Sequence, residues 1–306
     1  MGESPRWAAV VVNYESGPLL VDCVRSLLDD ASAGPSDVVV VDNGSTDGSV
    51  DRLRRAFPEV AVVGPGRNLG YAGAANRGIG ATRAPVVAVC NCDARIHPGT
   101  AAALLARFDA EPEVGAAGPA VFDEDGTRYP SARNEPSTGD AVGHAVVGLV
   151  RSDNPFTRRY RELDADPTAP RDVDWVSGAA IWLRRAALDT VGGWDERYFM
   201  YVEDVDLCAR LRQAGWRIVY EPGGAVTHVH GASTDRHPYR MIAEHHRSLL
   251  RFASSRWHGA KRALLVPAAG FLGVRAGVAM GVQAVLPRGG PGHRRGARRG
   301  TGEASG

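Results

Sequence analysis

The stretch Val38-Val39-Val40-Val41-Asp42-Asn43-Gly44-Ser45-Thr46-Asp47-Gly48-Ser49 decides the fold of this 306-residue chain. Four valines in succession predict a short strand buried on both faces, which is typical of a parallel sheet. Small polar residues follow directly, at the sheet edge where doubly wound proteins bind ligands. Asp42 can accept a hydrogen bond from an imide N–H or a ribose hydroxyl. An Asx turn with a helix cap at Ser45, Thr46 or Asp47 explains part of the run, but not the Asp42-Asn43 pair.

Apolar runs and helical patterns alternate on both sides of this stretch. Buried strands are predicted at residues 8–12, 38–41, 60–63 and 86–90, with helices at 19–28, 50–57 and 72–79. A further helix at about 98–108 leads to a strand near 114–117. This alternation predicts an α/β fold with a doubly wound, mostly parallel sheet.

The second half of the chain is less regular. Residues 123–172 are rich in Pro, Asp, Arg and Gly and predict long loops with short elements, which often form lids or acceptor-site walls. Regularity returns at 173–183. An acidic helix follows, then short strands at 217–220 and 225–229 and a helix at 238–252.

Residues 263–286 are apolar for long enough to cross a bilayer, but they contain Arg275, Gln283, Pro267 and four glycines. We therefore expect a helix that lies on a membrane or on the domain, rather than a true span. Residues 287–306 combine five arginines with glycines and predict a disordered tail, either solvated or in contact with anionic lipid.

The overall charge excludes a general affinity for nucleic acid. Lys and Arg number 36 against 35 Asp and Glu, so the formal charge is +1. Four cysteines without a small-domain disulfide pattern favour a reducing compartment, and the single Cys-x-Cys lacks the second pair of a zinc site. The first residues have neither a basic n-region nor a long apolar run. We expect a cytoplasmic chain, at the inner face of the plasma membrane if residues 263–286 reach it.

The stretch from Trp194 to Leu211 places several carboxylates and four aromatic rings before and within an amphipathic helix. At about 100° per residue, Asp204 lies in the middle of the apolar face and Asp206 points to the opposite side. That face consists of Leu207, Cys208, Leu211 and Ala214. A carboxylate against an apolar wall has a raised pKa, which is the environment of a general base. Helix capping by Glu203 and Asp204 explains the residues equally well.

Two further positions can hold a divalent metal ion. Asp93 follows the strand at 86–90, where a lone carboxylate suits Mg2+ or Mn2+ that is also held by a substrate's phosphates; the alternative is an ordinary turn aspartate. His228 and His230 alternate at the end of a predicted strand, so they point to opposite faces and one of them can be a ligand. A solvated pair of loop histidines is the commoner outcome.

The run Gly64-Pro65-Gly66-Arg67-Asn68-Leu69-Gly70 lies between a strand and a helix, as a dinucleotide fingerprint does. Its third glycine comes one residue late and Pro65 removes a donor, so the match fails. Arg67 and Asn68 can still reach a nucleotide.

Taken in order, these segments resemble the family 2 inverting glycosyltransferases with the GT-A fold, in particular their bacterial rhamnosyltransferase-like branch. The resemblance extends over about residues 7–235. Its motifs are Val11-Val12-Asn13-Tyr14, the run from Val41 to Gly48, Arg67-Asn68-Leu69-Gly70-Tyr71-Ala72-Gly73-Ala74-Ala75-Asn76, Asn91-Cys92-Asp93, Asp174-Trp175-Val176-Ser177-Gly178-Ala179, Gly192-Gly193-Trp194-Asp195-Glu196 and Glu203-Asp204-Val205-Asp206-Leu207.

The resemblance implies a domain organisation. A GT-A domain would occupy residues 1–235, with a nucleotide-binding half at about 7–120 and an acceptor half at about 121–235. A helical, membrane-associated segment at 236–286 and the tail at 287–306 would follow.

The resemblance also implies roles for single residues. Asp42 would contact the base or ribose, Asp93 would hold the metal with His228 as second ligand, and Asp204 would be the base beside Glu203. Donor contacts would also come from Asn13, Asn43, Ser45, Arg67, Asn68, Asn76, Asn91 and Gly178. The branch has Asn-Pro-Asp where this chain has Asn91-Cys92-Asp93, so the turn is less constrained and metal affinity can differ.

The implied activity is inverting transfer of a sugar, rhamnose from dTDP-rhamnose, to a glycan or lipid-linked hydroxyl, with an Asp base and Mg2+ or Mn2+. UDP-linked donors, including UDP-galactofuranose, remain open because selectivity depends on a few pocket contacts. A nucleotidyltransferase would share the fold without needing the inward Glu–Asp pair. A non-catalytic nucleotide-sugar binding protein would survive replacement of Asp204. Membrane contact by residues 263–286 would make the acceptor a lipid-linked cell-envelope glycan.

Overall fold

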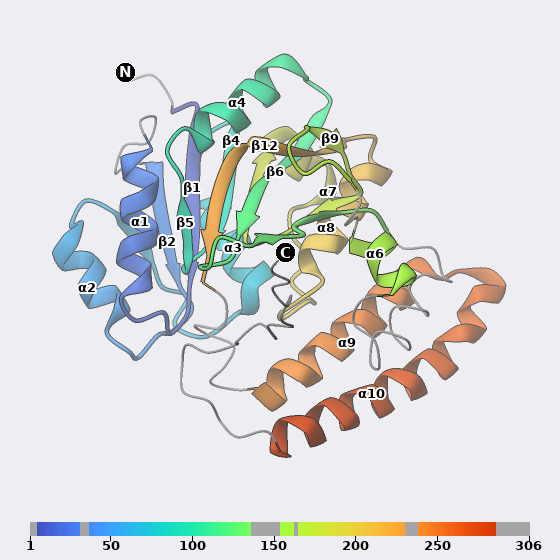
Figure 1. The fold of residues 1–306 in the computed structure, drawn as a ribbon. Coiled ribbons are helices and arrows are strands. Elements are labelled where there is room, and N and C mark those ends of the chain that lie inside the picture. The colour runs from blue at the N-terminus through green and yellow to red at the C-terminus, as the bar shows by residue number, and fades with distance from the viewer. Residues whose placement is uncertain (1–4, 31–36, 136–153, 162–164, 230–237, 286–306) are drawn as a thin grey trace, which may run out of the picture.

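The computed structural model describes residues 5–30, 37–135, 154–161, 165–229 and 238–285. A ten-stranded mixed sheet runs through the domain, with helices on both of its faces and two long helices to one side (Figure 1). The predicted α/β class and doubly wound sheet are confirmed. The positions of His230 and of the tail at 287–306 lie outside the described residues.

The first half of the chain builds the parallel part of the sheet. Its elements are β1 (Trp7–Asn13), α1 (Leu19–Asp29), β2 (Val38–Asp42), α2 (Ser49–Ala56), β3 (Ala61–Val63), α3 (Gly70–Gly80) and β4 (Val86–Asn91). The strand order is β3-β2-β1-β4, and Asn13 at the end of β1 pairs in register with Asp42 at the end of β2. Two polar residues therefore leave the sheet side by side at its carboxyl edge.

The second half makes the sheet mixed. Its elements are β5 (Ala94–Ile96), α4 (Thr100–Ala110), β6 (Val114–Phe122), β7 (Arg128–Tyr129), β8 (Ala132–Arg133), α6 (Pro155–Arg161), β9 (Arg171–Asp172), β10 (Trp175–Val176), β11 (Ala180–Arg184), α7 (Arg185–Val191), α8 (Glu203–Gln213) and β12 (Arg217–His228). The order continues β4-β11-β6-β12-β5, with β11 antiparallel to both neighbours. The β12–β5 pairing sets His228 opposite Ala94, next to Asp93.

The structure corrects several expectations about these elements. β3 is half exposed rather than buried on both faces, because it is the short strand at the edge of the sheet. Residues 217–228 form one strand instead of two, with a register shift between Glu221 and Ala225. The short β5 and α7 were not predicted, because three and seven residues carry little periodicity.

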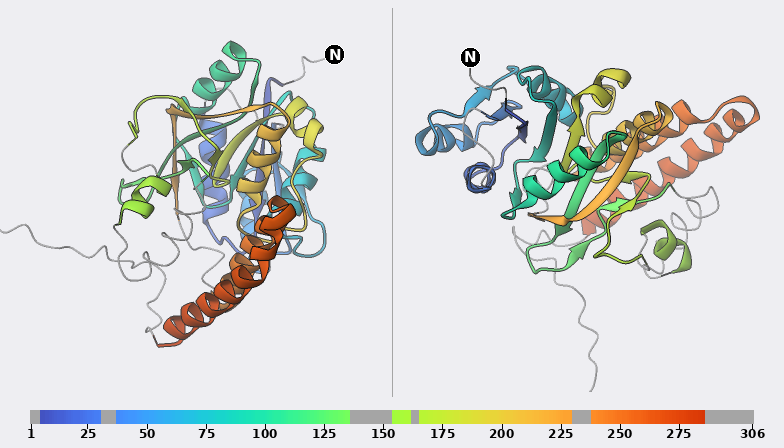
Figure 2. Two further views of the ribbon diagram at one scale, coloured as in Figure 1. Left: turned by 90° about the vertical axis from the view of Figure 1, so that its right-hand side faces the viewer. Right: turned by 90° about the horizontal axis from the view of Figure 1, so that it is seen from above.

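The C-terminal helices form a hairpin beside the domain. α9 (Pro238–Arg256) is followed by a 3-10 turn, η2 (Gly259–Leu264), and by α10 (Leu265–Val285). Figures 1 and 2 show α10 lying along α9 and away from the sheet. Among the described residues, one segment, Gly259–Ala284, is long and apolar enough to cross a membrane. Its valines face outward, with Val266 79% and Val274 70% exposed.

The two faces of the sheet bury separate apolar layers. In one layer, α1 and α4 cover the sheet, and the rings of Trp7 and Trp182 lie 6.2 Å apart. In the other layer, α3 and α8 cover the sheet, and Tyr71 packs edge-on against Trp194 at 5.5 Å. The predicted apolar face of α8 is buried in this second layer, except for Ala214, which is exposed beyond the end of the helix.

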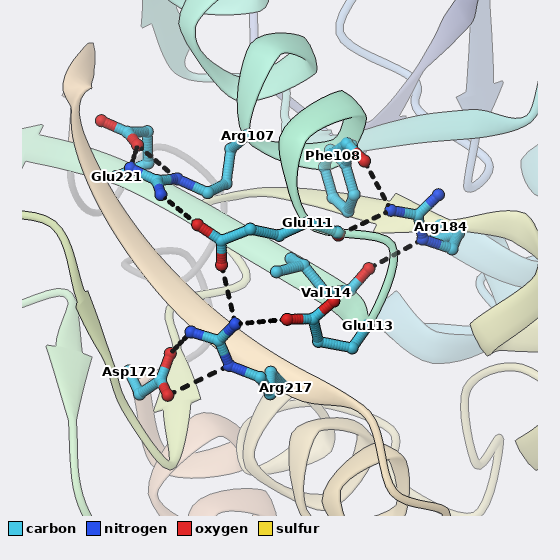
Figure 3. A network of polar contacts seen from close by, with 9 residues as sticks. All are labelled: Arg107, Phe108, Glu111, Glu113, Val114, Asp172, Arg184, Arg217 and Glu221. Carbon is cyan, nitrogen blue, oxygen red and sulfur yellow. Dashed lines mark hydrogen bonds and ion pairs between the residues drawn. The ribbon is translucent and has the colours of Figure 1, made fainter.

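An ion-pair network holds the first half of β12 (Figure 3). Arg107 Nε donates to Glu221 Oε2 at 2.8 Å, and Arg217 Nη2 donates to Asp172 Oδ1 at 2.6 Å. Glu111 contacts both guanidinium groups, first Arg107 and then Arg217, and its pKa is held below its ordinary value. The network ties α4, β9 and β12 together, and β12 carries His228 at its other end.

We predict that Gly78→Ala lowers the free energy of unfolding by about 1–3 kcal/mol, because a Cβ on this α3 residue would lie 2.2 Å from Val10 Cγ1 and 2.9 Å from Val41 Cγ2. Gly80→Ala is the matched control, since its Cβ meets nothing within 4 Å, and it should stabilise the protein by up to about 1 kcal/mol. Urea unfolding measures both. Equal effects of the two substitutions would contradict this packing of α3 on β1 and β2.

Candidate active site

Asn13 organises the loop that follows β2. Its side chain is fully buried, and its Nδ2 lies 2.9 Å from Asp42 Oδ1, 3.1 Å from Ser45 Oγ and 3.1 Å from Ser49 Oγ. Ser16 Oγ donates to Asn13 Oδ1 at 2.5 Å. Asn13 therefore positions Asp42 and Ser45, which are only partly buried and can present oxygens to a ligand.

Two acidic residues that the sequence analysis did not assign to the site hold the same loop. Glu15 Oε1 accepts hydrogen bonds from Thr46 N at 2.7 Å and Thr46 Oγ1 at 2.9 Å. Asp47 Oδ2 accepts from Gly17 N at 2.6 Å. Glu15 has a positive φ of 51°, which is uncommon for a residue with a side chain. Its hydrogen bonds and backbone conformation reveal its role in the loop, because the sequence pattern there carries no signal.

Asn43 and Asn68 join the β2 loop to the start of α3. Asn43 Oδ1 accepts from Leu69 N at 3.1 Å and Asn43 Nδ2 donates to Gly70 O at 3.0 Å, while Asn68 Oδ1 accepts from Gly70 N at 2.9 Å. Arg67 is exposed beside them. A Cβ on Gly44 would lie 3.7 Å from the backbone of Arg67, so the two loops are in contact. The loop that follows Asp42 and the loop that carries Arg67 and Asn68 are thus joined.

Asn76 lies further along α3 and faces a different loop. Its Nδ2 donates to Trp194 O at 2.9 Å and to Glu196 Oε1 at 3.0 Å, and its Oδ1 accepts from Trp194 N at 2.9 Å. Both ends of the amide are engaged within the protein. Asn76 thus holds the Trp194 loop, and the donor contact that the resemblance implies stays a prediction.

Asp93 and His228 meet beyond β4 and β12. His228 Nε2 lies 3.0 Å from Asp93 Oδ1 and 3.0 Å from Asn91 Nδ2. A ring-nitrogen lone pair and a carboxylate oxygen at this distance repel each other unless a proton or a cation lies between them. The Asp93 carboxylate suits Mn2+ or Mg2+ with further oxygens from a diphosphate, and the His228 imidazole can add one nitrogen ligand. Within the described ranges, no group of three or more His, Cys, Asp or Glu side chains could hold a metal ion.

Asp204, at the start of α8, is held against Gly178. Gly178 N donates to Asp204 Oδ2 at 2.8 Å, and Tyr71 Oη donates to Gly178 O at 2.6 Å. A Cβ on Gly178 would approach Asp204 Cβ to 3.3 Å, so glycine allows this close contact. Asn91 N donates to Ala179 O at 3.0 Å, which brings the strand leading to Asp93 beside the same loop.

Burial raises the pKa of both acidic groups at the start of α8. The pKa of Asp204 is raised by burial, although hydrogen bonds from the backbone of Gly178 and Val205 oppose the shift. The pKa of Glu203 is raised well above its ordinary value, first by burial and then by the charge of Asp204. Glu203 Oε2 is buried without a hydrogen-bond partner in the described part of the chain. Burial therefore favours the protonated form of both adjacent carboxyl groups.

Asp206, predicted on the side of the helix opposite Asp204, is also buried. Arg210 Nε donates to Asp206 Oδ2 at 2.7 Å and Tyr198 Oη donates to its Oδ1 at 3.3 Å. The side of α8 that carries Asp206 is covered by Tyr198 of the preceding loop, which a helical projection of α8 alone cannot reveal. Asp206 forms a structural ion pair with Arg210. Asp204 is the carboxylate that lies beside the Gly178 loop.

The loop before α8 is strained. Tyr201 and Val202 have φ values of 68° and 69°, and left-handed backbone is especially unfavourable for a β-branched residue. Gly70 meets this loop at Phe199, whose carbonyl oxygen would lie 2.3 Å from a Cβ on Gly70. Strain of this kind persists only where neighbouring structure holds it.

The sequence is similar to a known protein family and to characterised enzymes. A family model described as "Glycosyltransferase like family 2" matches residues 5–247. The chain is 42% identical over 267 residues to the N-acetylglucosaminyl-diphospho-decaprenol L-rhamnosyltransferase of Mycobacterium tuberculosis H37Rv, covering 84% of this chain and 86% of the relative. It is 32% identical over 203 residues to the pre-mycofactocin glycosyltransferase of the same organism, covering 63% of this chain and 37% of that protein.

Among solved structures, the mannosyltransferase PcManGT from Pyrobaculum calidifontis, in complex with GDP-Man and Mn2+, aligns with a TM-score of 0.55 and 20% identity. The alignment covers 92% of this chain and 75% of that one. At this level of identity the likeness concerns the fold alone, and it confirms the GT-A fold expected from the sequence motifs.

We predict that Glu203→Gln becomes more stable relative to the wild type as pH rises from about 5 to 8. Because the folded protein raises the pKa of Glu203, this carboxyl favours folding at low pH and loses that contribution as pH rises through its folded pKa. Thermal unfolding across this range measures the difference, with Glu59→Gln as a control for loss of an exposed charge. A stability difference between Glu203→Gln and the wild type that is the same at every pH would contradict burial of an ionisable Glu203.

Proposed function

The chain belongs to glycosyltransferase family 2 and is a glycosyltransferase, and we propose that it transfers L-rhamnose from dTDP-rhamnose, with inversion, to a lipid-linked acceptor hydroxyl. The observation that carries this proposal is Asp204, a carboxylate of raised pKa held by Gly178 N–H beside the loop that leads to Asp93. The similarity to a rhamnosyltransferase over most of both chains supports the sugar. UDP-linked donors, including UDP-galactofuranose, are the alternative.

The relative's name supplies an acceptor class. It describes N-acetylglucosaminyl-diphospho-decaprenol as the acceptor of that enzyme. We infer that this chain uses an acceptor of the same chemistry, a polyprenyl diphosphate that carries an N-acetylated sugar. The family assignment favours this transfer over nucleotidyl transfer and over non-catalytic binding of a nucleotide sugar.

The proposed mechanism is a single displacement. Asp204 accepts the proton of the acceptor hydroxyl as its oxygen forms a bond to the anomeric carbon, and the bond from that carbon to the diphosphate breaks on the opposite face. Asp204 is suited to this step because burial brings its pKa nearer to neutrality. Glu203, which holds its proton more tightly, would leave Asp204 as the ionised member of the pair.

The negative charge on the departing diphosphate would lie near Asp93 and His228. These residues would hold a divalent ion, which when bound would neutralise the developing negative charge. Asp42, Ser45, Asn68 and Arg67 would contact the nucleotide, because these residues lie on the joined loops after β2 and before α3. Asn13 and Asn43 would act by positioning those loops, and Asn76 by positioning the loop at Trp194.

We predict that dTDP raises the melting temperature in the presence of Mn2+ by more than UDP or GDP does. A ligand at roughly 100 times its Kd adds about 2.7 kcal/mol of stability, which corresponds to several degrees. Asp93→Asn should remove the part of the shift that depends on Mn2+, whereas Asp51→Asn, on the exposed face of α2, should retain it. The absence of a shift with any nucleotide would contradict the donor site.

We further propose that α10 lies on the membrane surface that carries the acceptor. One side of α10 packs on α9, and the other presents Val266, Val274, Val278 and Val282, each at least 52% exposed. Lys261 and Arg262 lie at the start of this apolar segment, and the sequence of α10 contains no acidic residue. An exposed apolar face next to basic residues fits an anionic lipid surface.

We predict that Val274→Asp combined with Val278→Asp abolishes cosedimentation with vesicles that contain anionic lipid, because two carboxylates oppose burial of this face in the bilayer. The combination of Ala56→Asp and Ala81→Asp adds the same charge at exposed positions of the domain and should leave vesicle binding intact. Vesicle binding that survives the α10 substitutions would refute this surface. Self-association without vesicle binding would instead assign the face to a second copy of the chain.

A further inference from the structure

The loop that leads into α8 is held from two sides through its backbone. Phe199 O accepts a hydrogen bond from Tyr71 N at 2.9 Å, on the side of α3. Met200 O accepts from Ser248 Oγ at 3.0 Å and Arg197 O accepts from Arg251 Nη1 at 2.7 Å, both on the side of α9. Donors from two separate helices therefore fix three carbonyl groups within four consecutive residues.

Side chains of α9 also pack on the rings of this loop. The guanidinium of Arg240 lies 4.5 Å from the ring centroid of Phe199, and that of Arg251 lies 5.9 Å from the ring of Tyr198. The ring of His245 meets Tyr201 edge-on at 5.4 Å. The rings at residues 198, 199 and 201 are thus in contact with one face of α9.

The same helix reaches the other end of α8. Arg256 Nη2 lies 3.0 Å from Glu135 Oε1, and Glu135 also pairs with Arg212 of α8 at 3.6 Å. Arg212 pairs in addition with Asp174 at 2.7 Å, on the segment that leads to Gly178. Both ends of the helix that carries Asp204 are therefore linked to α9.

These contacts lie where backbone strain has to be opposed. The left-handed Tyr201 and Val202 immediately precede Glu203 and Asp204, so relaxation of the loop would rotate or displace the first turn of α8. Ser248 is only 4% exposed, and its hydroxyl donates to a backbone carbonyl of the loop rather than to a carbonyl of its own helix. Such a bond specifies the position of the loop.

We propose that Ser248 and Arg251 are positioning residues of the transferase, which hold Asp204 in place through the loop at 197–202. Both residues lie beyond the family match, which ends at residue 247. The inference rests on the proposed role of Asp204 as the base. It also makes α9 part of the catalytic architecture, whereas the resemblance implies a separate segment at residues 236–286.

The test compares Ser248→Ala with Ser254→Ala, because Ser254 is exposed on the same helix and donates only to Arg251 O of its own helix. Steady-state transfer is measured from low to neutral pH for both variants. We expect Ser248→Ala to lower kcat by about tenfold or more with little change in the KM for the donor, since misplacement of a base by a fraction of an ångström is costly. Ser254→Ala should behave as the wild type.

The pH profile separates positioning from general stability. The titratable and charged groups around Asp204 are Glu203, Tyr71, Cys208 and Arg133. When the loop loosens, water reaches Asp204 and its pKa falls, so the acid limb of kcat should move to lower pH in Ser248→Ala. A lower melting temperature with an unchanged kcat and acid limb overturns the proposal.

Hydrogen exchange supplies a readout that needs no substrate. Peptides spanning residues 197–206 should exchange faster in Ser248→Ala than in Ser254→Ala, and equal exchange overturns the proposal. If the wild type transfers no sugar from any donor, the proposed function fails, while faster exchange would still support a role of α9 in placing the Asp204 carboxylate. Arg251→Ala against Arg247→Ala, which removes only a surface pair with Glu244, repeats the comparison if Ser248→Ala does not fold.

Discussion

The hydrogen bond from Gly178 N–H to Asp204 Oδ2 is the contact on which the candidate site depends. It joins the loop before β11 to the first turn of α8, and Tyr71 at the start of α3 completes the link through Gly178 O. Three elements that are distant in sequence thereby meet at one carboxylate. The bond also favours the ionised form of Asp204, while burial favours the protonated form, and burial has the larger effect. The result is a carboxylate whose pKa is raised and whose orientation is fixed by the bond from Gly178.

Local patterns could predict the framework of this site. Successive valines followed by Asp42 and Asn43 identify a buried strand and its polar end, and helical periodicity correctly placed Leu207 and Cys208 in the core. The pairing of Asn13 with Asp42 follows from parallel register once both strands are recognised. These inferences succeed because each depends on a few neighbouring residues and on geometry common to all strands and helices.

Contacts between distant segments could not be predicted from such patterns. Asp206 was assigned to the outer side of α8, but Tyr198 and Arg210 cover it there. Glu15 gave no sequence signal because its role depends on a positive φ and on a loop some 30 residues away. The bonds from α9 to the loop before α8 span 48 and 54 residues, so no local period reveals them. In each case a side chain with no marked pattern gains its role from tertiary packing.

The central claim is that Asp204 is the base of an inverting transferase. The most direct measurement is kcat for sugar transfer by Asp204→Asn, made together with the Kd for dTDP in the presence of Mn2+. The account predicts that kcat falls by about 10²- to 10⁴-fold while nucleotide affinity is retained, because the amide cannot accept the proton and the donor site lies on other loops. Turnover close to that of the wild type would contradict it.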